Sequence, residues 1–441
     1  MNLPDFEHSG SQVTGNIDAP AIKRQLFRSI RRNRPIVEDA ELSGWLNNLV
    51  NRLTRHAPGV GNDLFVVIEN NPAINAYALT GGIIVVNSGL ILSTGSESEL
   101  AAVLAHEIAH VSQRHLTRMY NDQKNSPLLT GLGILAGAAV SGKSPEAAQA
   151  IITGTMAIQA QQQVSYSQQY ESEADRVGLR ILAGAGFNAN AMATFLEKLE
   201  RNESNTLGNL SKYLRSHPLS IERLSDTRTR AGSLRNPVRE STDYLYAREK
   251  LRAIYQPDHN NPAQGLTPAL SNYYQALQQF RRDNHPAVIN ILGTRATQLP
   301  AALLIARSLN ALQRFTEAEQ LLKPLQNQYP QNTSINLLLA QAVSGKGDKQ
   351  YAWQLINRIR TTESTSLEFF ETAQNIAQQA GQQHEAIIYT AERNLRLGEY
   401  KYARLALEQS LRTQPANHIK ARLQQKLNEV IQAQNELDYL K

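Results

Sequence analysis

The sequence contains no cysteine, few aromatic residues and no large excess of one charge. Without cysteine the chain has no disulfides, thiolate zinc ligands, iron–sulfur clusters or cysteine nucleophile, so any metal site must use His, Asp or Glu. A cysteine-free chain suits oxidising and reducing compartments equally, so this absence does not predict a location. The net charge of +6 is too small for 441 residues to indicate a nucleic-acid-binding protein.

Basic residues gather most densely between Arg28 and Arg34, where four arginines surround Ile30 and Asn33. Aromatic residues do not alternate with them, and short charge runs usually lie on the solvated face of a helix. We therefore predict a solvated helix face at this segment and no nucleic-acid partner.

Long apolar runs are also lacking. Residues 125–142 and 147–170 are nearly free of charge, but the first stretch is short of apolar residues and the second contains seven glutamines. A membrane span needs about 20 predominantly apolar residues, so neither stretch is predicted to cross a membrane. The first residues do not have the charged and apolar regions of a signal peptide, which leaves two interpretations: a cytosolic protein, or numbering that begins after a removed leader.

The length and a mean hydropathy of -0.40 predict a folded protein of two or three domains. Apolar spacing predicts two helices within residues 20–57, and β-branched runs bounded by Asn and Gly predict two or three strands of one small sheet. Ser96 and Glu99 form a capping box that predicts the start of a buried helix. The strands are expected at 63–69, 74–79 and 83–87, further helices at 165–183, 190–202 and 220–231, and marginal helices at 121–167.

From about residue 268 the chain becomes a helical array with internal self-similarity. Ala318, Ala352 and Ala386 follow one another at intervals of 34 residues, and Pro330 lies 12 residues after Ala318. A period of 34 with a small residue at the crossing of two helices resembles a tetratricopeptide array, with an atypical last unit. The alternative is a plain helical bundle with a coincidental spacing.

The chemistry is concentrated in His106-Glu107-Ile108-Ala109-His110. Two histidines at i and i+4 lie on one face of a helix and can bind one metal ion, while the glutamate between them can hold a water beside it. The alternative interpretation of the motif is a helix with two ordinary exposed histidines. However, the surrounding face is apolar, and buried imidazoles without partners would leave their nitrogens unsatisfied. The motif therefore predicts a zinc hydrolase.

A third ligand is needed, and Glu171 is the best candidate. It shares a helix face with Asp175 one turn later, so one carboxylate can bind the metal while the other accepts a hydrogen bond from a ligating histidine. His115 is rejected as a ligand, because on a continuous helix it lies about 180° from His106. Glu173 points off this face and is predicted to be solvated.

Taken together, these segments resemble the zinc peptidase family that includes the CAAX prenyl endopeptidases. With its C-terminal repeats, the chain is similar to periplasmic members of that family that serve the assembly of outer-membrane β-barrels. The resemblance covers nearly the whole chain. The segments that carry it are Ala76–Ala78 with Gly81–Val85, Glu99–His110, Glu171–Asp175 with Gly178, and Ser216–Pro218.

The resemblance also implies roles for single residues. It makes His106, His110 and Glu171 the ligands of one Zn²⁺, Glu107 the general base, and Asp175 the second carboxylate. It further implies that the strand Ile83, Ile84, Val85, Val86 and Asn87 binds the substrate backbone as an exposed strand edge. Export to the periplasm is implied as well, and this rests on a leader having been omitted.

His217 has two functional interpretations and a structural one. Near the metal it either donates a hydrogen bond to the oxyanion of the reaction or occupies the fourth zinc position and keeps the enzyme latent. In the structural interpretation it only packs a turn before Pro218.

We therefore expect an α+β, mostly helical protein: a zinc metallopeptidase domain at residues 1–255, a linker at 256–265 and tetratricopeptide repeats at 266–441. The expected function is endopeptidase cleavage of misassembled proteins, with outer-membrane β-barrel proteins and their assembly machinery recruited by the repeats. The alternatives are a periplasmic chaperone or scaffold whose peptidase is mostly silent, and a cytosolic zinc hydrolase. Residues 127–160 are expected to form a lid, a peripheral membrane contact or a segment packed on the core.

Overall fold

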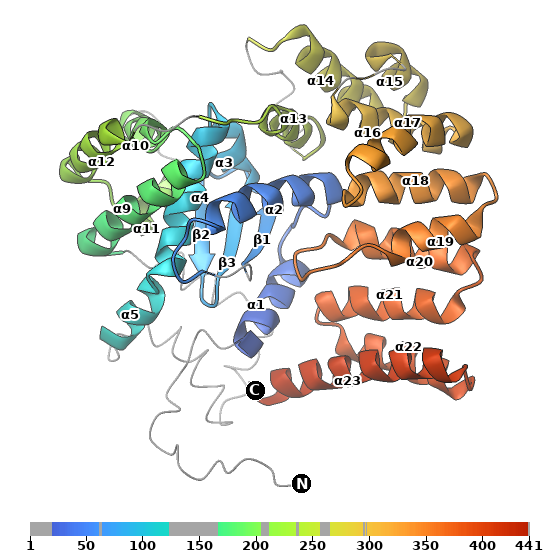
Figure 1. Cartoon of the computed structure of the whole chain (residues 1–441). Helices are drawn as coiled ribbons and strands as arrows, with labels where there is room; N and C mark the ends of the chain where they lie inside the picture. Colours follow the sequence, from blue (N-terminus) through green and yellow to red (C-terminus); the bar gives the residue numbers. More distant parts are fainter. Residues whose placement is uncertain are drawn as a thin grey trace, which may run out of the picture.

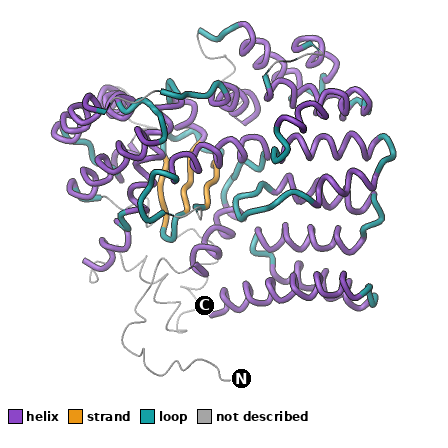
Figure 2. Tube along the Cα trace, in the orientation of Figure 1, coloured by secondary structure: helices purple, strands orange, loops and turns teal. Residues whose placement is uncertain are grey.

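The computed structural model describes residues 20–60, 64–122, 166–203, 211–234, 238–255, 265–293, 296 and 298–439. The N-terminal part places helices around a small sheet, and the C-terminal part is a stack of antiparallel helix pairs beside it (Figures 1 and 2). The expectation of an α+β, mostly helical protein is therefore confirmed.

The sheet has three strands: β1 (Phe65–Glu69), β2 (Ala76–Leu79) and β3 (Ile83–Asn87). Their order is β1-β3-β2, with β3 parallel to β1 and antiparallel to β2. Gly81 and Gly82 form the tight turn between β2 and β3 with positive φ values of 74° and 85°, which glycine adopts without steric cost.

The expectation that Ile83–Asn87 offers an exposed edge to a substrate is wrong. β3 is the central strand, so its hydrogen-bonding groups are used by β1 on one side and β2 on the other. The outer side of β1 is also covered, because the N–H of Val37 donates to the carbonyl of Ile68. In the described residues, β2 is therefore the strand whose outer edge is not paired with another strand.

The helices of the N-terminal part match most of the predicted ones. Ser96 caps α4 by accepting the N–H of Glu99, and Asp39 caps α2 by accepting those of Glu41 and Leu42. The elements are α1 (Pro20–Asn33), α2 (Ala40–Thr54), α3 (Ser88–Ser93), α4 (Glu97–Ser112), α5 (His115–Asp122), α9 (Gln168–Gly184), α10 (Asn190–Glu203), α11 (Ser211–Ser216), α12 (Ile221–Ser233), α13 (Asp243–Lys250) and the π-helix η1 (Leu251–Tyr255).

Helix α9 lies directly against α4, which is buried along most of its length. Gly178 makes this close crossing possible, because a Cβ there would lie 3.1 Å from Cε of Met192 and 3.2 Å from the backbone nitrogen of His106. Any side chain would push the two helices apart. The residues that follow one face of α9 are thereby brought next to the middle of α4.

The C-terminal helices stack in antiparallel pairs. Ala318, Ala352 and Ala386 lie on α17, α19 and α21 and are all buried, as the 34-residue spacing predicts. The elements are α14 (Pro268–Phe280), α15 (His285–Leu292), α16 (Leu299–Ala311), α17 (Phe315–Gln328), α18 (Thr333–Gly345), α19 (Lys349–Asn357), α20 (Leu367–Gln379), α21 (Gln383–Arg396), α22 (Tyr400–Arg412) and α23 (Asn417–Tyr439).

The basic segment on α1 is not a solvated face, contrary to expectation. Arg28 and Arg31 are buried against the C-terminal helices. Nε of Arg31 pairs with Glu38 at 2.7 Å, and its terminal nitrogens donate to the carbonyls of Glu363 and Thr365 at 2.9 and 2.8 Å. The loop before α20 therefore supplies acceptors that the local sequence around the arginines does not reveal.

A second set of buried charges lies near the start of α2, where the two parts meet. Nζ of Lys250 lies 2.8 Å from Oδ2 of Asp39 and 2.7 Å from Oε2 of Glu41. Glu368 of α20 accepts the N–H of Ala40 at 2.7 Å. Side chains of α13 and η1 also share one apolar cluster with α14, so residues 243–255 contact both parts.

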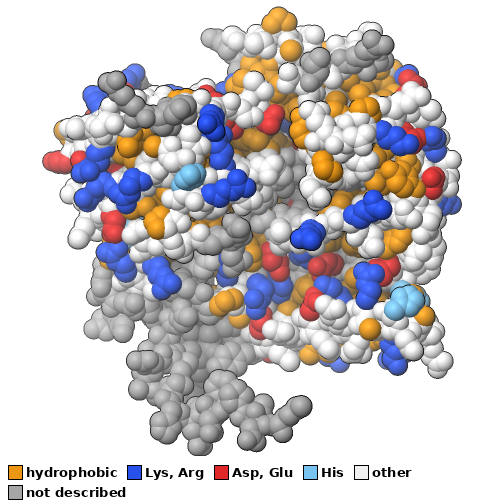
Figure 3. Space-filling view, viewed as in Figure 1, with side chains coloured by type: hydrophobic (Ala, Val, Ile, Leu, Met, Phe, Trp, Pro, Cys, Tyr) orange, Lys and Arg blue, Asp and Glu red, His pale blue; other side chains and the backbone are white. Residues whose placement is uncertain are grey.

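Several expectations concern residues that lie outside the described part of the chain. These are residues 256–264 of the expected linker and the whole of the segment 127–160. No helix among the described residues has both the length and the apolar character required to cross a membrane. On the face drawn in Figure 3, basic side chains are scattered over both parts rather than gathered into one stripe.

Arg31→Ala should lower the free energy of unfolding by about 3 kcal/mol, because it removes the cationic partner of Glu38 and the donor to two half-buried carbonyls. Arg32→Ala is the matched control, since Arg32 is exposed on the same helix, and it should change stability by less than about 0.5 kcal/mol. Urea unfolding followed by fluorescence of Trp45 in α2 and Trp353 in α19 measures both parts. Equal effects of the two substitutions would contradict the buried role of Arg31.

Candidate metal centre

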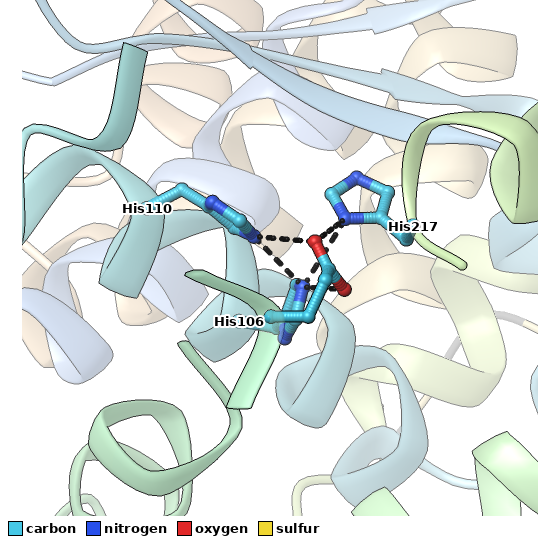
Figure 4. Close-up of side chains that lie close together, drawn as sticks. His106, His110 and His217 are labelled. Atoms are coloured by element: carbon cyan, nitrogen blue, oxygen red, sulfur yellow. Dashed lines mark hydrogen bonds and ion pairs between the residues drawn. The ribbon is translucent and has the colours of Figure 1, made fainter. Parts of the chain in front are cut away.

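The two histidines of α4 and the glutamate of α9 converge on one point. Nε2 of His106 lies 3.0 Å from Nε2 of His110. Oε2 of Glu171 lies 3.5 Å from Nε2 of His106, and Oε1 lies 3.3 Å from Nε2 of His110. Figure 4 labels the histidines at this point, and their imidazole rings face one another.

His217 completes the group from the segment that follows α11. Its Nδ1 lies 2.9 Å from Oε1 of Glu171 and 3.3 Å from Nε2 of His106. The ring is held between Tyr213 and Tyr166, whose centroids lie 4.7 and 5.4 Å away with interplanar angles of 30°. The four residues are buried, and one ligand atom from each lies within 4.8 Å of all the others.

This donor set fits a tetrahedral zinc ion. Zinc bound to nitrogen or oxygen at about 2.0–2.1 Å keeps tetrahedral ligand atoms about 3.4 Å from one another. Five separations between these donors run from 2.9 to 3.5 Å, with Oε2 of Glu171 facing His106 and Oε1 facing the other two histidines, and all four ligand atoms lie within 4.8 Å of one another. Imidazoles and a carboxylate are also the donors that zinc accepts in a protein without cysteine.

Electrostatics favour a cation at this point. Burial alone would lower the pKa of His106, but the carboxylates of Glu171 and Asp175 outweigh it and raise that pKa to about 10. Burial likewise opposes ionisation of Glu171, yet the neighbouring His217 and His106 hold its pKa well below its usual range. Burial lowers the pKa of His110 well below its ordinary value. The cluster therefore contains an ionised carboxylate that is compensated by positive charge.

Glu107 lies beside the cluster and is bound to the sheet. Its Oε2 accepts the N–H of Ala78 on β2 at 3.1 Å, and its Oε1 lies 3.4 Å from Nε2 of His217. Oε1 has no hydrogen-bond partner within the part of the chain that is described. Burial raises the pKa of Glu107. One carboxylate oxygen is thus anchored, and the other is directed toward the site.

Asp175 accepts a hydrogen bond from the far nitrogen of a clustered histidine. Its Oδ1 lies 2.9 Å from Nδ1 of His106, which fixes the orientation of that ring. Burial would raise the pKa of Asp175, but its bonds to His106 and Arg223 lower it.

Arg223 is the residue that sequence analysis missed. Its guanidinium forms two hydrogen bonds to Asp175 at 2.8 and 3.0 Å and lies 2.7 Å from Oε2 of Glu171. It also donates to the carbonyl of Pro218 at 2.6 Å, next to His217. Arg223 belongs to a helix rich in other charges, and nothing in its local pattern separates it from the solvated ones.

Two further residues near the motif, His115 and Glu173, lie outside the cluster but contact its surroundings. His115 is outside the four clustered residues, but it contacts His110, with 2.9 Å between the Nδ1 atoms. Glu173 is not simply solvated, because its carboxylate pairs with both His115 and Arg118. The structure therefore brings together His106, Glu107, His110, Glu171, Asp175 and His217. β3 lies one strand further away, behind β2.

Comparison with known proteins adds an independent line of support. Residues 40–231 match the sequence profile of peptidase family M48. This range includes α2, the sheet, α4 and every residue of the cluster. The chain is 36% identical over 331 residues to the beta-barrel assembly-enhancing protease of Yersinia pestis, and 34% identical over 333 residues to that of Escherichia coli K12.

These two alignments cover 75% of this chain and 64% of each relative, so the chain spans less than two thirds of their length. A more distant relative is the mitochondrial metalloendopeptidase OMA1 of Arabidopsis thaliana. It is 32% identical over 170 residues, which is 38% of this chain and 32% of that protein. The similarity to OMA1 thus covers a shorter segment of this chain than the similarity to the first two relatives does.

Arg223→Leu should destabilise the fold by about 3–5 kcal/mol, because two buried carboxylates lose their only arginine partner among the described residues. Arg228→Leu on the same helix is the control, since its side chain is 65% exposed and its loss should cost less than about 1 kcal/mol. Denaturant unfolding followed by circular dichroism measures both values. If Arg223→Leu were as stable as Arg228→Leu, the carboxylates would have to be neutral or otherwise compensated.

Proposed function

We propose that this chain is a zinc-dependent endopeptidase of peptidase family M48, whose sequence profile residues 40–231 match. The observation that carries the proposal is the convergence of His106, His110, Glu171 and His217 on one point beside the anchored carboxylate of Glu107. When bound there, zinc would supply Lewis acidity toward the peptide carbonyl and lower the pKa of a nearby water.

A side chain of the protein, Glu107, would transfer the proton of the water. Glu107 would accept a proton from water at its unpartnered Oε1 and return it to the leaving nitrogen of the peptide. Burial raises the pKa of Glu107, which suits a group that must both take up and release a proton. Its bond to the N–H of Ala78 keeps the other oxygen in place during both transfers.

We assign substrate binding to β2 rather than β3. In the antiparallel register with β3, the carbonyl of Asn75 accepts the N–H of Asn87, so Ala76 and Ala78 direct their backbone groups away from the sheet. The outward N–H of Ala78 already meets Glu107. An extended substrate segment that adds to this edge would place its backbone beside the site.

The geometry favours latency over oxyanion binding for His217. Its Nδ1 lies beside the donor atoms of Glu171 and His106, so it would take the fourth corner of a tetrahedral zinc site, which a catalytic site keeps open for water or substrate. Arg223 holds the adjacent carbonyl of Pro218, so the segment is fixed in this position. We therefore propose that the described conformation is the latent one and that His217 must withdraw before cleavage.

The wider proposal concerns clients and location. Two relatives are named for β-barrel assembly, so we propose that this protein acts on misassembled outer-membrane β-barrel proteins in the periplasm. The stacked helix pairs would recruit these clients or their assembly machinery, because such stacks offer extended binding surfaces. The corner position of His217 also favours a second function, a chaperone or scaffold whose peptidase is usually silent.

Purified protein should contain about one zinc per chain, and Glu171→Ala should lose it under a mild chelator wash that the wild type withstands. Glu200→Ala, which removes an exposed carboxylate of α10, should keep the metal.

Glu107→Gln should also keep zinc but cleave an unfolded protein substrate at least about 100-fold more slowly. A cellular phenotype that survives in Glu107→Gln would point to the scaffold function.

His217→Ala should increase cleavage by on the order of tenfold, because the rate of the wild type is reduced by the fraction of molecules in which the fourth position is closed. His384→Ala, a histidine of α21, should leave the rate unchanged. The rate is measured with the same unfolded substrate in zinc-loaded protein. A decrease would assign His217 to the oxyanion, and no change would reduce it to packing.

A further inference from the structure

His115 is a buried histidine at the start of α5 that the proposed reaction does not use. Its Nδ1 lies 2.9 Å from Nδ1 of His110, and its Nε2 lies 3.2 Å from Oε2 of Glu173. The same oxygen accepts a hydrogen bond from Arg118 at 2.9 Å. A continuous row of polar atoms therefore runs from His110 to Glu173 and Arg118, whose side chains are 31% and 43% exposed.

A break in the helix places His115 there. α4 ends at Ser112, and Arg114 adopts a positive φ of 51°, which costs a non-glycine residue on the order of 1 kcal/mol. The chain turns sharply before α5 begins, so the ring of His115 lies against that of His110 with 4.8 Å between centroids. On an uninterrupted helix His115 would point to the opposite side from His106.

The positions of the protons follow from the hydrogen-bond geometry. Nε2 of His110 faces the cluster, so its lone pair is the one directed at a metal ion, and a neutral imidazole then carries its proton on Nδ1. A 2.9 Å contact between two Nδ1 atoms needs one proton, which His110 supplies. His115 must therefore accept at Nδ1 and carry its own proton on Nε2, where Glu173 accepts it.

We propose that His115 is a positioning residue for the metal centre, and that the row His110–His115–Glu173 fixes the ring plane and tautomer of His110 so that Nε2 is presented to zinc. Asp175 does the same for His106 through its Nδ1. The two histidines of α4 are thus oriented from opposite sides, one by a carboxylate directly and the other through a second imidazole. Such supports raise the basicity of a ligating histidine.

The test compares His115→Phe, which keeps a ring but cannot accept a hydrogen bond, with His115→Asn, whose amide oxygen can take the place of Nδ1. The zinc dissociation constant is measured by competition with a chromophoric chelator. His115→Phe should bind zinc about 10–100-fold more weakly than the wild type, and His115→Asn should stay within about threefold of it. The matched control is His384→Phe on α21, which should not change zinc binding.

A second readout follows the proton itself. In ¹⁵N-histidine-labelled, zinc-loaded protein, the Nδ1–H of His110 should give a slowly exchanging proton signal because it is buried and hydrogen-bonded. The signal should persist in His115→Asn and be lost in His115→Phe. Thermal unfolding of each variant separates these effects from a loss of folded protein.

The inference rests on the proposed zinc site, and the outcomes separate the two. If the wild type takes up no zinc, the proposed function fails and this inference fails with it. If the wild type binds zinc and His115→Phe binds it equally well, or if Phe and Asn weaken it equally, the positioning role alone is overturned. Should His115→Phe not fold, Glu173→Leu replaces it, because it removes the last acceptor at a partly exposed position. Zinc binding about threefold weaker supports the row, and unchanged binding overturns it.

Discussion

The close crossing of α4 and α9 is the constraint on which the rest of the structure depends. It brings an ionised glutamate into a buried position between two imidazoles, where the carboxylate is stable only because positive charge surrounds it. Gly178 lets the helices approach this closely, and Arg223 and His106 carry the compensating positive charge. A side chain at this position would need Met192 or the backbone at His106 to shift by a few tenths of an ångström.

A similar relation between burial and compensation joins the two parts of the protein. Arg31 is buried and donates to carbonyls of the loop before α20, and Glu368 of α20 accepts the N–H of Ala40 at the start of α2. Desolvation of buried charges offsets much of their attraction, but the removal of one partner leaves the other buried and uncompensated. The sheet and the cluster are therefore held in a fixed relation to the helix pairs.

Much of this structure could be predicted from local pattern. The helical spacing, the capping box at Ser96 and the glycine turn before β3 each act within a few residues, and they predicted the corresponding elements closely. The metal motif was equally local, because its two histidines share one turn of a helix. The 34-residue alanine spacing located the helix crossings for the same reason.

What could not be predicted depends on long-range partners. The sequences of the strands do not determine their order in the sheet, so β3 was predicted to be an edge strand although it is the central one. Arg28, Arg31 and Arg223 have ordinary surroundings in sequence and find their acceptors only in the folded chain. His115 was judged on an unbroken helix, and the left-handed residue Arg114 invalidates that geometry.

The last helix returns to the first. Arg24 of α1 pairs with Glu436 of α23 at 2.6 Å, and Gln25 donates to the carbonyl of Ala433, while α13 and η1 hold α14 at the other end of the stack. A stack of helix pairs that is attached to the rest of the protein at only one end can change its length and curvature freely, but this stack is attached at both ends. Because helices of the stack also contact α1 and α2, bending of the stack would strain these contacts and is thereby coupled to the layer that carries the sheet.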